Sequence, residues 1–149
     1  DTHTLELSSA ASDVYKRQSA SKQAFCANFA SEAEYDSGLR GQFEYRDLGI
    51  SEATGGQYHA GVMRVRDEAK GDQQLGHTGM HRHLCDFQMF YVLKGWCKME
   101  YEGQGEMTFH EGDCCLQPAA IAHNELLCSE DFECIEIYSP AKHETVPTD

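Results

Sequence analysis

Two histidines, His81 and His83, stand one residue apart in the segment MHRH and can act on one metal ion together. On a β-strand, residues i and i+2 project to the same face. Gln88 opens the next strand-like segment, QMFYVLKG, and His123 lies on a later one, IAHNELL. Ligands from three strands meet only if the sheet closes around them, as it does in a small barrel. The spacing lets His81 and His83 bind one ion together, with Gln88 and His123 as the further candidate ligands.

Two glutamates are the candidate catalytic residues, because chemistry at a metal ion on a small polar molecule needs a group that moves protons. Glu125 lies two residues after His123, so a strand turns both to one face. Glu136 lies between Ile135 and Ile137 and takes the face opposite to theirs. The sequence does not decide which of these faces is the interior, so Glu136 is directed either at the metal or at solvent.

Other reactive residues are expected to have structural roles. Tyr58 and His59 are neighbours on a strand, so only one of them can face inward. His110, in a turn, and His143, in the polar tail, are predicted to face solvent. Cys85 lies between two of the proposed ligands, and we expect it to be an inert packing residue.

The segments that carry these residues are short and rich in β-branched and aromatic side chains, and turn residues separate them. From Gln42 onward they are FEYRDLGI, YHAGVMRVR, MHRH, QMFYVLKG, WCKMEYEG, EMTFHEG, CCLQP, IAHNELL and ECIEIYSP. This number of short strands with almost no helical period is typical of an antiparallel sandwich or barrel. QMFYVLKG is apolar on both faces, so its outer face needs cover from the N-terminal arm or from a second subunit.

We divide the chain into four parts. Residues 1–18 lack packing logic and include ASDVYKRQ, which resembles a translated adapter, so we treat them as a non-native or disordered leader. Residues 19–41 are expected to form an arm or a short helix. Residues 42–140 form the predicted barrel domain, and residues 141–149 a polar tail.

The order of residues around the predicted ligands resembles the two motifs of the cupin superfamily. From His83 the chain runs four residues to Gln88 and six more to Gly95; from Gly112 it runs five residues to Pro118, with His123 five positions later. Sixteen residues separate the two motifs, as in compact bacterial cupins. The resemblance covers residues 42–140 and implies an all-β, cupin-type antiparallel β-barrel, a jelly-roll double sheet.

Several positions depart from the cupin pattern. The first glycine is displaced to Gly76 or Gly79, Ala120 replaces a glycine, and Leu127 replaces an asparagine. The departure that changes chemistry is Gln88, where the family usually has glutamate. Sets of three histidines and one glutamine resemble those of uronate-processing enzymes and of some manganese-dependent hydroxynitrile lyases.

The resemblance implies that His81, His83, Gln88 and His123 hold one divalent metal ion. It also implies a metalloenzyme that acts on a small organic molecule. A neutral glutamine leaves the ion its full charge, which favours Lewis-acid lyase or isomerase chemistry over dioxygenase-type chemistry. The ion can be Zn, Mn, Ni or Fe, and the sequence does not choose among them. The alternatives are a non-catalytic barrel that binds a small ligand, and a pocket without metal in which Gln88 only makes hydrogen bonds.

Composition restricts the partners. The formal net charge of −13 disfavours nucleic acid and anionic membrane surfaces, and no apolar run approaches the roughly 20 residues of a membrane span. Seven cysteines, an odd number without a CxxC pair, predict free thiols in a reducing cytoplasm. The resemblance to small cupins, together with the apolar outer face of QMFYVLKG, predicts a homodimer.

Overall fold

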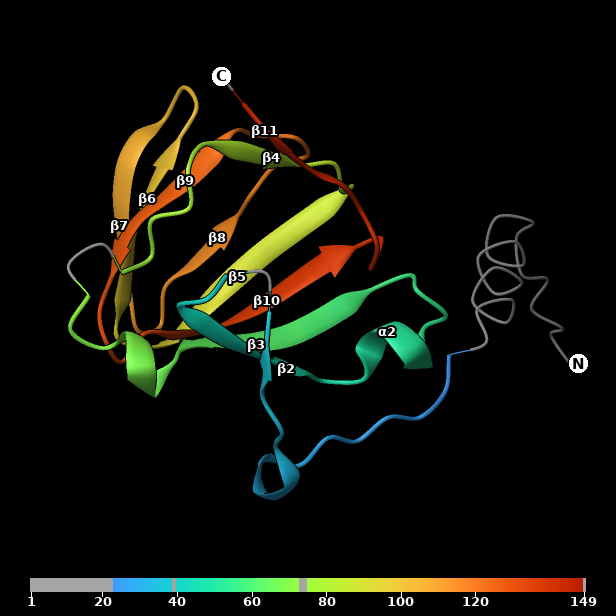
Figure 1. Ribbon diagram of the computed structural model, residues 1–149. Helices are drawn as coiled ribbons and strands as arrows, with labels where there is room; N and C mark the ends of the chain where they lie inside the picture. The colour runs from blue at the N-terminus through green and yellow to red at the C-terminus, as the bar shows by residue number, and fades with distance from the viewer. Residues whose placement is uncertain (1–22, 39, 73–74, 149) are drawn as a thin grey trace, which may run out of the picture.

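The computed structural model describes residues 23–38, 40–72 and 75–148 as a predominantly β structure (Figure 1). The leader assigned to residues 1–18 lies outside the described residues. The strands are β1 (Asp36–Ser37), β2 (Phe43–Asp47), β3 (His59–Val65), β4 (His81–His83), β5 (Phe87–Lys94), β6 (Trp96–Tyr101), β7 (Gly105–His110), β8 (Cys114–Leu116), β9 (His123–Cys128), β10 (Glu133–Ser139) and β11 (Thr145–Pro147). Single turns of helix form η1 (Ala30–Glu32), α2 (Ile50–Ala53) and η2 (Asp67–Ala69).

The strands form two antiparallel sheets, which confirms the predicted double-sheet architecture. One sheet has the order β1-β2-β3-β10-β5-β8 and the other β11-β4-β9-β6-β7. Neighbouring strands are often distant in sequence, as where β10 lies between β3 and β5. This interleaving brings β4, β5, β9 and β10, which carry all the predicted site residues, to the same interior (Figure 1).

Side-chain alternation fills the space between the sheets. Along β6, Cys97, Met99 and Tyr101 are buried and the residues between them are partly exposed. Along β5, the inward residues are Gln88, Phe90 and Val92, as the alternation predicts. Because alternate residues of a strand face opposite sides, a polar residue at an inward position enters the interior without changing the facing of its neighbours.

The outer face of β5 is only partly covered. Tyr91 is 40% exposed and Leu93 41%, and Leu116 on the neighbouring β8 is 62% exposed. The arm of residues 23–38 lies instead along β2 and α2 (Figure 1): Ala24 N donates to Ala53 O, and Arg64 lies 3.6 Å from the ring centroid of Tyr35. The expected cover for β5 is therefore not supplied by the described part of the arm.

Two segments differ from the predictions. The strand expected to reach Ile50 ends at Asp47, because Gly49 has a φ of 77° and turns the chain into α2. The segment after Pro140, expected to be a polar extension, contains β11, which pairs with β4 over three residues. No helix in the described ranges is long and apolar enough to cross a bilayer.

Candidate metal centre

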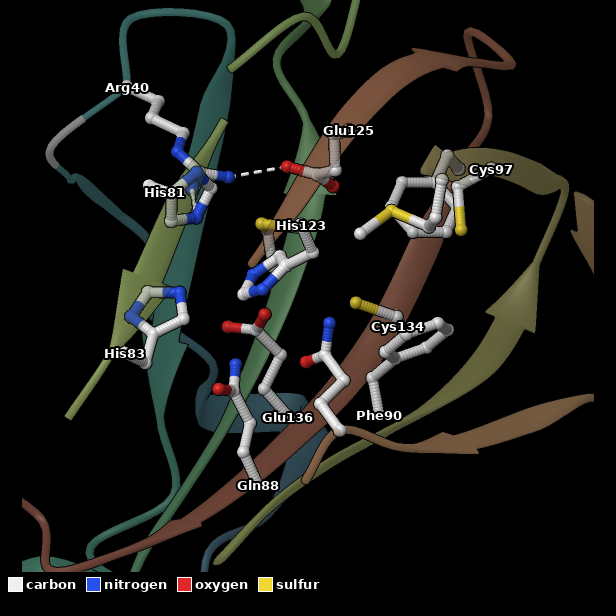
Figure 2. Close-up of a pocket in the computed structure, with 14 residues that line it drawn as sticks. Arg40, His81, His83, Gln88, Phe90, Cys97, His123, Glu125, Cys134 and Glu136 are labelled. Atoms are coloured by element: carbon white, nitrogen blue, oxygen red, sulfur yellow. Dashed lines mark hydrogen bonds and ion pairs between the residues drawn. The ribbon is translucent and has the colours of Figure 1, made fainter. Parts of the chain in front are cut away.

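The three predicted histidine ligands lie together on adjacent strands. His81 and His83 come from β4 and His123 from β9, and His81 is the direct cross-strand partner of His123. One ligand nitrogen from each of the three can be chosen so that all lie within 4.8 Å of one another. Figure 2 shows the three rings grouped on one side of the cavity. Among the described residues, this cluster has the donor types and spacing of a metal site.

The outer nitrogen of each ring is held by an oxygen of the chain. The Nδ1 contacts are Gly79 O to His81 at 2.7 Å, Thr145 Oγ1 to His83 at 2.9 Å, and Ile121 O to His123 at 3.1 Å. A carbonyl can only accept, so Nδ1 of His81 and of His123 carries the proton and donates. Nε2 of each ring then carries a lone pair that can bind a metal ion, as in most histidine-ligated sites.

The rings are neutral as well as oriented. Burial, helped by neighbouring imidazoles, lowers the pKa of His83 to about 3 and that of His123 to about 4. Burial also lowers the pKa of His81. Because a metal ion binds unprotonated imidazole, all three ligands are available at neutral pH without losing a proton first.

Gln88, the predicted fourth ligand, is buried on β5 and lines the same cavity as the histidines. The thiol of Cys85 lies 3.8 Å from Oε1 of Gln88. Cys85 is itself buried, and burial raises its pKa, so it remains a neutral thiol that packs against the amide. Gln88 therefore lines the same cavity as the histidines, and its role as a fourth ligand stays a prediction.

The inner cavity is small and its floor is rich in sulfur. Its volume of about 30 Å³ holds one or two water-sized groups. The residues that line it away from the histidines are mostly sulfur-containing or aromatic: Met63, Phe90, Cys97, Met99, Phe132 and Cys134. Burial raises the pKa of Cys97 and of Cys134, so these are neutral thiols rather than anionic ligands.

Glu136 faces this cavity, which resolves the alternative that the sequence left open. Its cross-strand partner on β5 is the inward Phe90, whereas Ile135 and Ile137 are paired with Tyr91 and Met89 on the outer face. Figure 2 shows its carboxylate directed at the space between His83 and His123. Burial raises the pKa of Glu136, because desolvation disfavours its charged form.

Glu125 shares the inward face of β9 with His123, as predicted, but it is ion-paired. Its carboxylate accepts a short hydrogen bond from Nη1 of Arg40, and its backbone N–H donates to Oγ1 of Thr78 at 3.0 Å. Burial raises the pKa of Glu125 to about 7 against the opposing effect of Arg40. Of the two glutamates, Glu125 is therefore fixed in place and Glu136 is not.

Sequence reasoning missed Arg40. It comes from the turn between β1 and β2, and its Nη2 lies 3.3 Å from Nε2 of His81 (Figure 2). Arg40 and His81 are 41 positions apart in the sequence, and no motif links them. The turn that carries Arg40 is positioned by long-range structure, since β1 pairs with β2 and β2 pairs with β3.

A larger pocket of about 680 Å³ opens beside the inner cavity, and we call it the mouth pocket. Five residues line both: Arg40, Met63, His83, Gln88 and Glu136. His59 also lines the mouth pocket, whereas His110 is exposed far from it.

The prediction that His143 faces solvent is wrong. Its ring packs edge-on against His83 at 5.4 Å and against Tyr138 at 4.7 Å, and it lines the mouth pocket. Pairing of β11 with β4 draws the segment before β11 back over the site, which the polar composition of the tail did not indicate.

No protein-family model matches the chain, and no curated protein matches it. Solved structures do. An RmlC-like cupin from Shewanella frigidimarina NCIMB 400 aligns with a TM-score of 0.62 and 19% identity over 81% of this chain and 96% of that one. KdgF from a Halomonas species aligns with a TM-score of 0.60 and 19% identity over 80% of this chain and 96% of that one. The polyketide cyclase RemF from Streptomyces resistomycificus aligns with a TM-score of 0.66 and 13% identity over 84% of this chain and 86% of that one. The chain therefore has the cupin fold.

Proposed function

We propose that this cupin-fold chain is a metal-dependent enzyme that acts on a small organic molecule by Lewis-acid chemistry. The observation that supports it most is the histidine cluster, in which Nδ1 of each ring contacts an oxygen of the chain and one nitrogen from each ring can be chosen so that all three lie within 4.8 Å of one another. His81, His83 and His123 would hold the ion, with Oε1 of Gln88 as the fourth donor. This donor set suits Zn, Mn, Ni or Fe.

A bound divalent ion supplies Lewis acidity, which polarises a carbonyl or hydroxyl group or acidifies a bound water. The four protein donors are all neutral, so none of them offsets the charge of the ion. This favours lyase or isomerase chemistry over chemistry that needs a high oxidation state, which an anionic ligand would support.

The other residues of the site would have separate roles in proton transfer, positioning and exclusion of water. Glu136 would take a proton from the substrate and return it, since it faces both cavities and has no ion pair or hydrogen bond to another described residue. Glu125 would hold Arg40 in place. The sulfur and aromatic floor keeps bulk water from the inner side of the site, and this strengthens electrostatic interactions there.

Metal content tests the first part of the proposal. Protein purified without chelator is expected to carry about one divalent ion per chain by inductively coupled plasma mass spectrometry. His123→Ala should lose it, and the exposed-site control His110→Ala should keep it. Wild-type protein without metal after reloading, or equal metal content in the two variants, would contradict the proposal.

Turnover tests the second part. Metal-loaded protein is assayed against small carbonyl and hydroxyl compounds with and without dioxygen. Turnover that is independent of dioxygen supports lyase or isomerase chemistry, and turnover that requires it would replace this assignment with a dioxygenase-type one. Saturable binding without turnover across the panel would favour a non-catalytic ligand-binding cupin.

The assembly and location are part of the proposal. A homodimer would cover the exposed outer face of Tyr91, Leu93 and Leu116. All seven cysteines are free thiols in the structure, which supports a reducing compartment such as the cytoplasm.

A further inference from the structure

A second glutamine, Gln117, lines the inner cavity together with Gln88. It directly follows β8, and its backbone N–H donates to the carbonyl oxygen of Gln88 at 2.9 Å. In the register of β5 with β8, Met89 lies opposite Leu116, which is 62% exposed on the outer face. The next pair of residues, Gln88 and Gln117, therefore takes the inward face, and Gln117 is only 4% exposed. Two amides thus lie opposite each other on the inner face of this sheet.

A chain of hydrogen bonds fixes the orientation of the Gln117 amide. The thiol of Cys115 donates to the carbonyl oxygen of Leu116 at 3.5 Å. Tyr101 is hydrogen-bonded to the side chain of Cys115. Because the thiol proton is already engaged, the hydroxyl of Tyr101 donates to the sulfur, and its oxygen accepts from Nε2 of Gln117 at 3.0 Å. The carbonyl oxygen Oε1 is therefore the part of the Gln117 amide that Tyr101 leaves unused.

Oε1 of Gln117 faces the inner cavity without a donor. It accepts no hydrogen bond from another described residue. It is also not enclosed by protein atoms, because the fully enclosed side-chain polar atom without a partner, among the described residues, is Oγ1 of Thr148. The free space that Gln117 lines is the inner cavity. Since a buried acceptor left unpaired costs free energy, this oxygen is a binding group for a donor that enters the cavity.

The inner cavity restricts that donor to a small and neutral group. Its volume of about 30 Å³ holds one or two water-sized groups. An ammonium group there would lose its hydration and would lie close to the proposed divalent ion, so both effects disfavour it. A hydroxyl group is small and uncharged, and its O–H can donate to an amide oxygen.

A row of inward side chains joins the inner cavity to the mouth pocket. Tyr138 on β10 lies opposite Gln88 on β5, and Gln88 lies opposite Gln117. Tyr138 lines the mouth pocket, Gln117 lines the inner cavity, and Gln88 lines both. A molecule whose hydroxyl group reaches Gln117 can therefore place the rest of its atoms in the mouth pocket, which has a volume of about 680 Å³.

We propose that Oε1 of Gln117 accepts a hydrogen bond from a hydroxyl group of the substrate, and that the substrates are small neutral hydroxy compounds. Gln117 would then determine specificity, since a site that pairs a buried acceptor with a substrate hydroxyl rejects analogues that lack the hydroxyl. This inference rests on the proposed function for the reaction itself. The hydrogen bond to Gln117 uses none of the four proposed metal donors.

Dissociation constants for hydroxyacetone and for acetone, which lacks only the hydroxyl group, test the proposal by NMR titration of zinc-loaded and metal-free protein. The wild type should bind hydroxyacetone about tenfold more tightly, the factor expected of one buried hydrogen bond. Gln117→Met keeps the length of the side chain but removes the acceptor, so the preference should disappear. Gln104→Met, the same change at an exposed position in the turn between β6 and β7, should keep it.

Tyr101→Phe provides a second variant that leaves Gln117 in place. It removes the oxygen that accepts from Nε2, so the amide can rotate and Oε1 no longer faces the cavity all the time. The preference for hydroxyacetone should fall about threefold. This variant keeps the ring of Tyr101 in the core and so separates loss of the hydrogen bond from loss of packing. Melting temperatures show that each variant is folded.

Equal binding of the two ketones by the wild type, or an unchanged preference in Gln117→Met, overturns the proposal, because water is then the partner of Oε1. A preference that is lost in His123→Ala but kept in Gln117→Met also overturns it, since the hydroxyl group then binds the metal ion, and the proposed function stands. A preference that depends on Gln117 in a protein that never takes up metal supports the hydroxyl site while the proposed function fails.

Discussion

Arg40 and His81 share a contact that bears directly on metal binding: Nη2 of the guanidinium lies 3.3 Å from Nε2 of the imidazole. Since Nδ1 of His81 donates to Gly79 O, Nε2 is the acceptor in this contact. Nε2 has one lone pair, which serves either the guanidinium or a metal ion. Arg40 is therefore a competitor for one metal ligand and, through Nη1, the partner of Glu125.

Replacing Arg40 with glutamine should tighten metal binding. The change removes both the competing donor and a positive charge beside a site whose proposed donors are all neutral, and we expect about a tenfold lower dissociation constant for zinc. Competition with a chromophoric chelator measures it. Arg66→Gln, which removes a surface pair with Glu68, is the control and should leave the affinity unchanged. Weaker binding in the Arg40 variant would show that its pairing with Glu125 supports the site.

The metal-free protein should lose stability as the pH falls from 6.5 towards 4. His83 and His123 have folded-state pKa values of about 3 and about 4, below the 6.5 of an unfolded chain. The unfolded state therefore takes up protons first, so the stabilisation present above pH 6.5 is lost through this window. Urea unfolding at several pH values measures it. A His83→Asn/His123→Asn variant should show a flatter profile, and an equally steep one would be inconsistent with this origin.

Glu125 should make the protein less stable as the pH rises, opposite to the effect of the histidines. Its folded-state pKa is about 7 against an ordinary 4.5, so the stabilisation from its protonated form is complete below pH 4.5 and is lost as the pH rises through 7. Relative to the wild type, Glu125→Gln should therefore gain stability between pH 4 and pH 8, on the order of 3 kcal/mol. If the difference in free energy of unfolding between the two proteins is the same at every pH in this range, the raised pKa assigned to Glu125 is refuted.

Glu136→Gln should separate catalysis from metal binding. The amide keeps the shape of the side chain but cannot exchange a proton, so kcat should fall by roughly 10² to 10⁴. Metal content should stay close to that of the wild type and the melting temperature should not fall, because Glu136 has no ion pair among the described residues and burial disfavours its charged form. Glu133→Gln, on the same strand but outside both cavities, is the control. Loss of metal together with activity would instead make Glu136 part of the ligand set.

A lysine on the outer face of the six-stranded sheet should prevent the proposed homodimer. Tyr91→Lys and Leu116→Lys place a charge on an exposed apolar surface, so the monomer should fold and the dimer interface should not form. Light scattering after size exclusion should show two chains for the wild type and one for these variants. Met107→Lys, equally exposed but on the other sheet, should remain dimeric. A wild-type protein that is monomeric in this measurement would contradict the proposed homodimer.

The sequence predicted the parts of the site that follow from local alternation. His81 and His83 share a face because they are i and i+2, and Gln88 faces inward with Phe90 and Val92 for the same reason. It could not decide whether Glu136 faces inward, because a two-residue period fixes relative facing only. The cross-strand pairing of Glu136 with Phe90, a long-range contact, decided it.

The residues that the sequence missed lie outside regular alternation. Arg40 is in a turn and His143 in a connection, and both reach the site only through strand pairings that no short motif encodes. The exact ends of strands were also beyond the sequence, as at Asp47, because a single glycine with positive φ determined where the strand stopped.

The sulfur-rich floor of the inner cavity has a chemical consequence. Met63, Met99, Cys97 and Cys134 line the same space as the histidines. Peroxide or radical species produced there would convert these thioethers and thiols to sulfoxides and sulfenic acids, which are polar and would swell a tightly packed interior. Such a lining suits a catalyst that never releases an oxidant. Peptide mass spectrometry after prolonged aerobic turnover would detect oxidation of these four side chains.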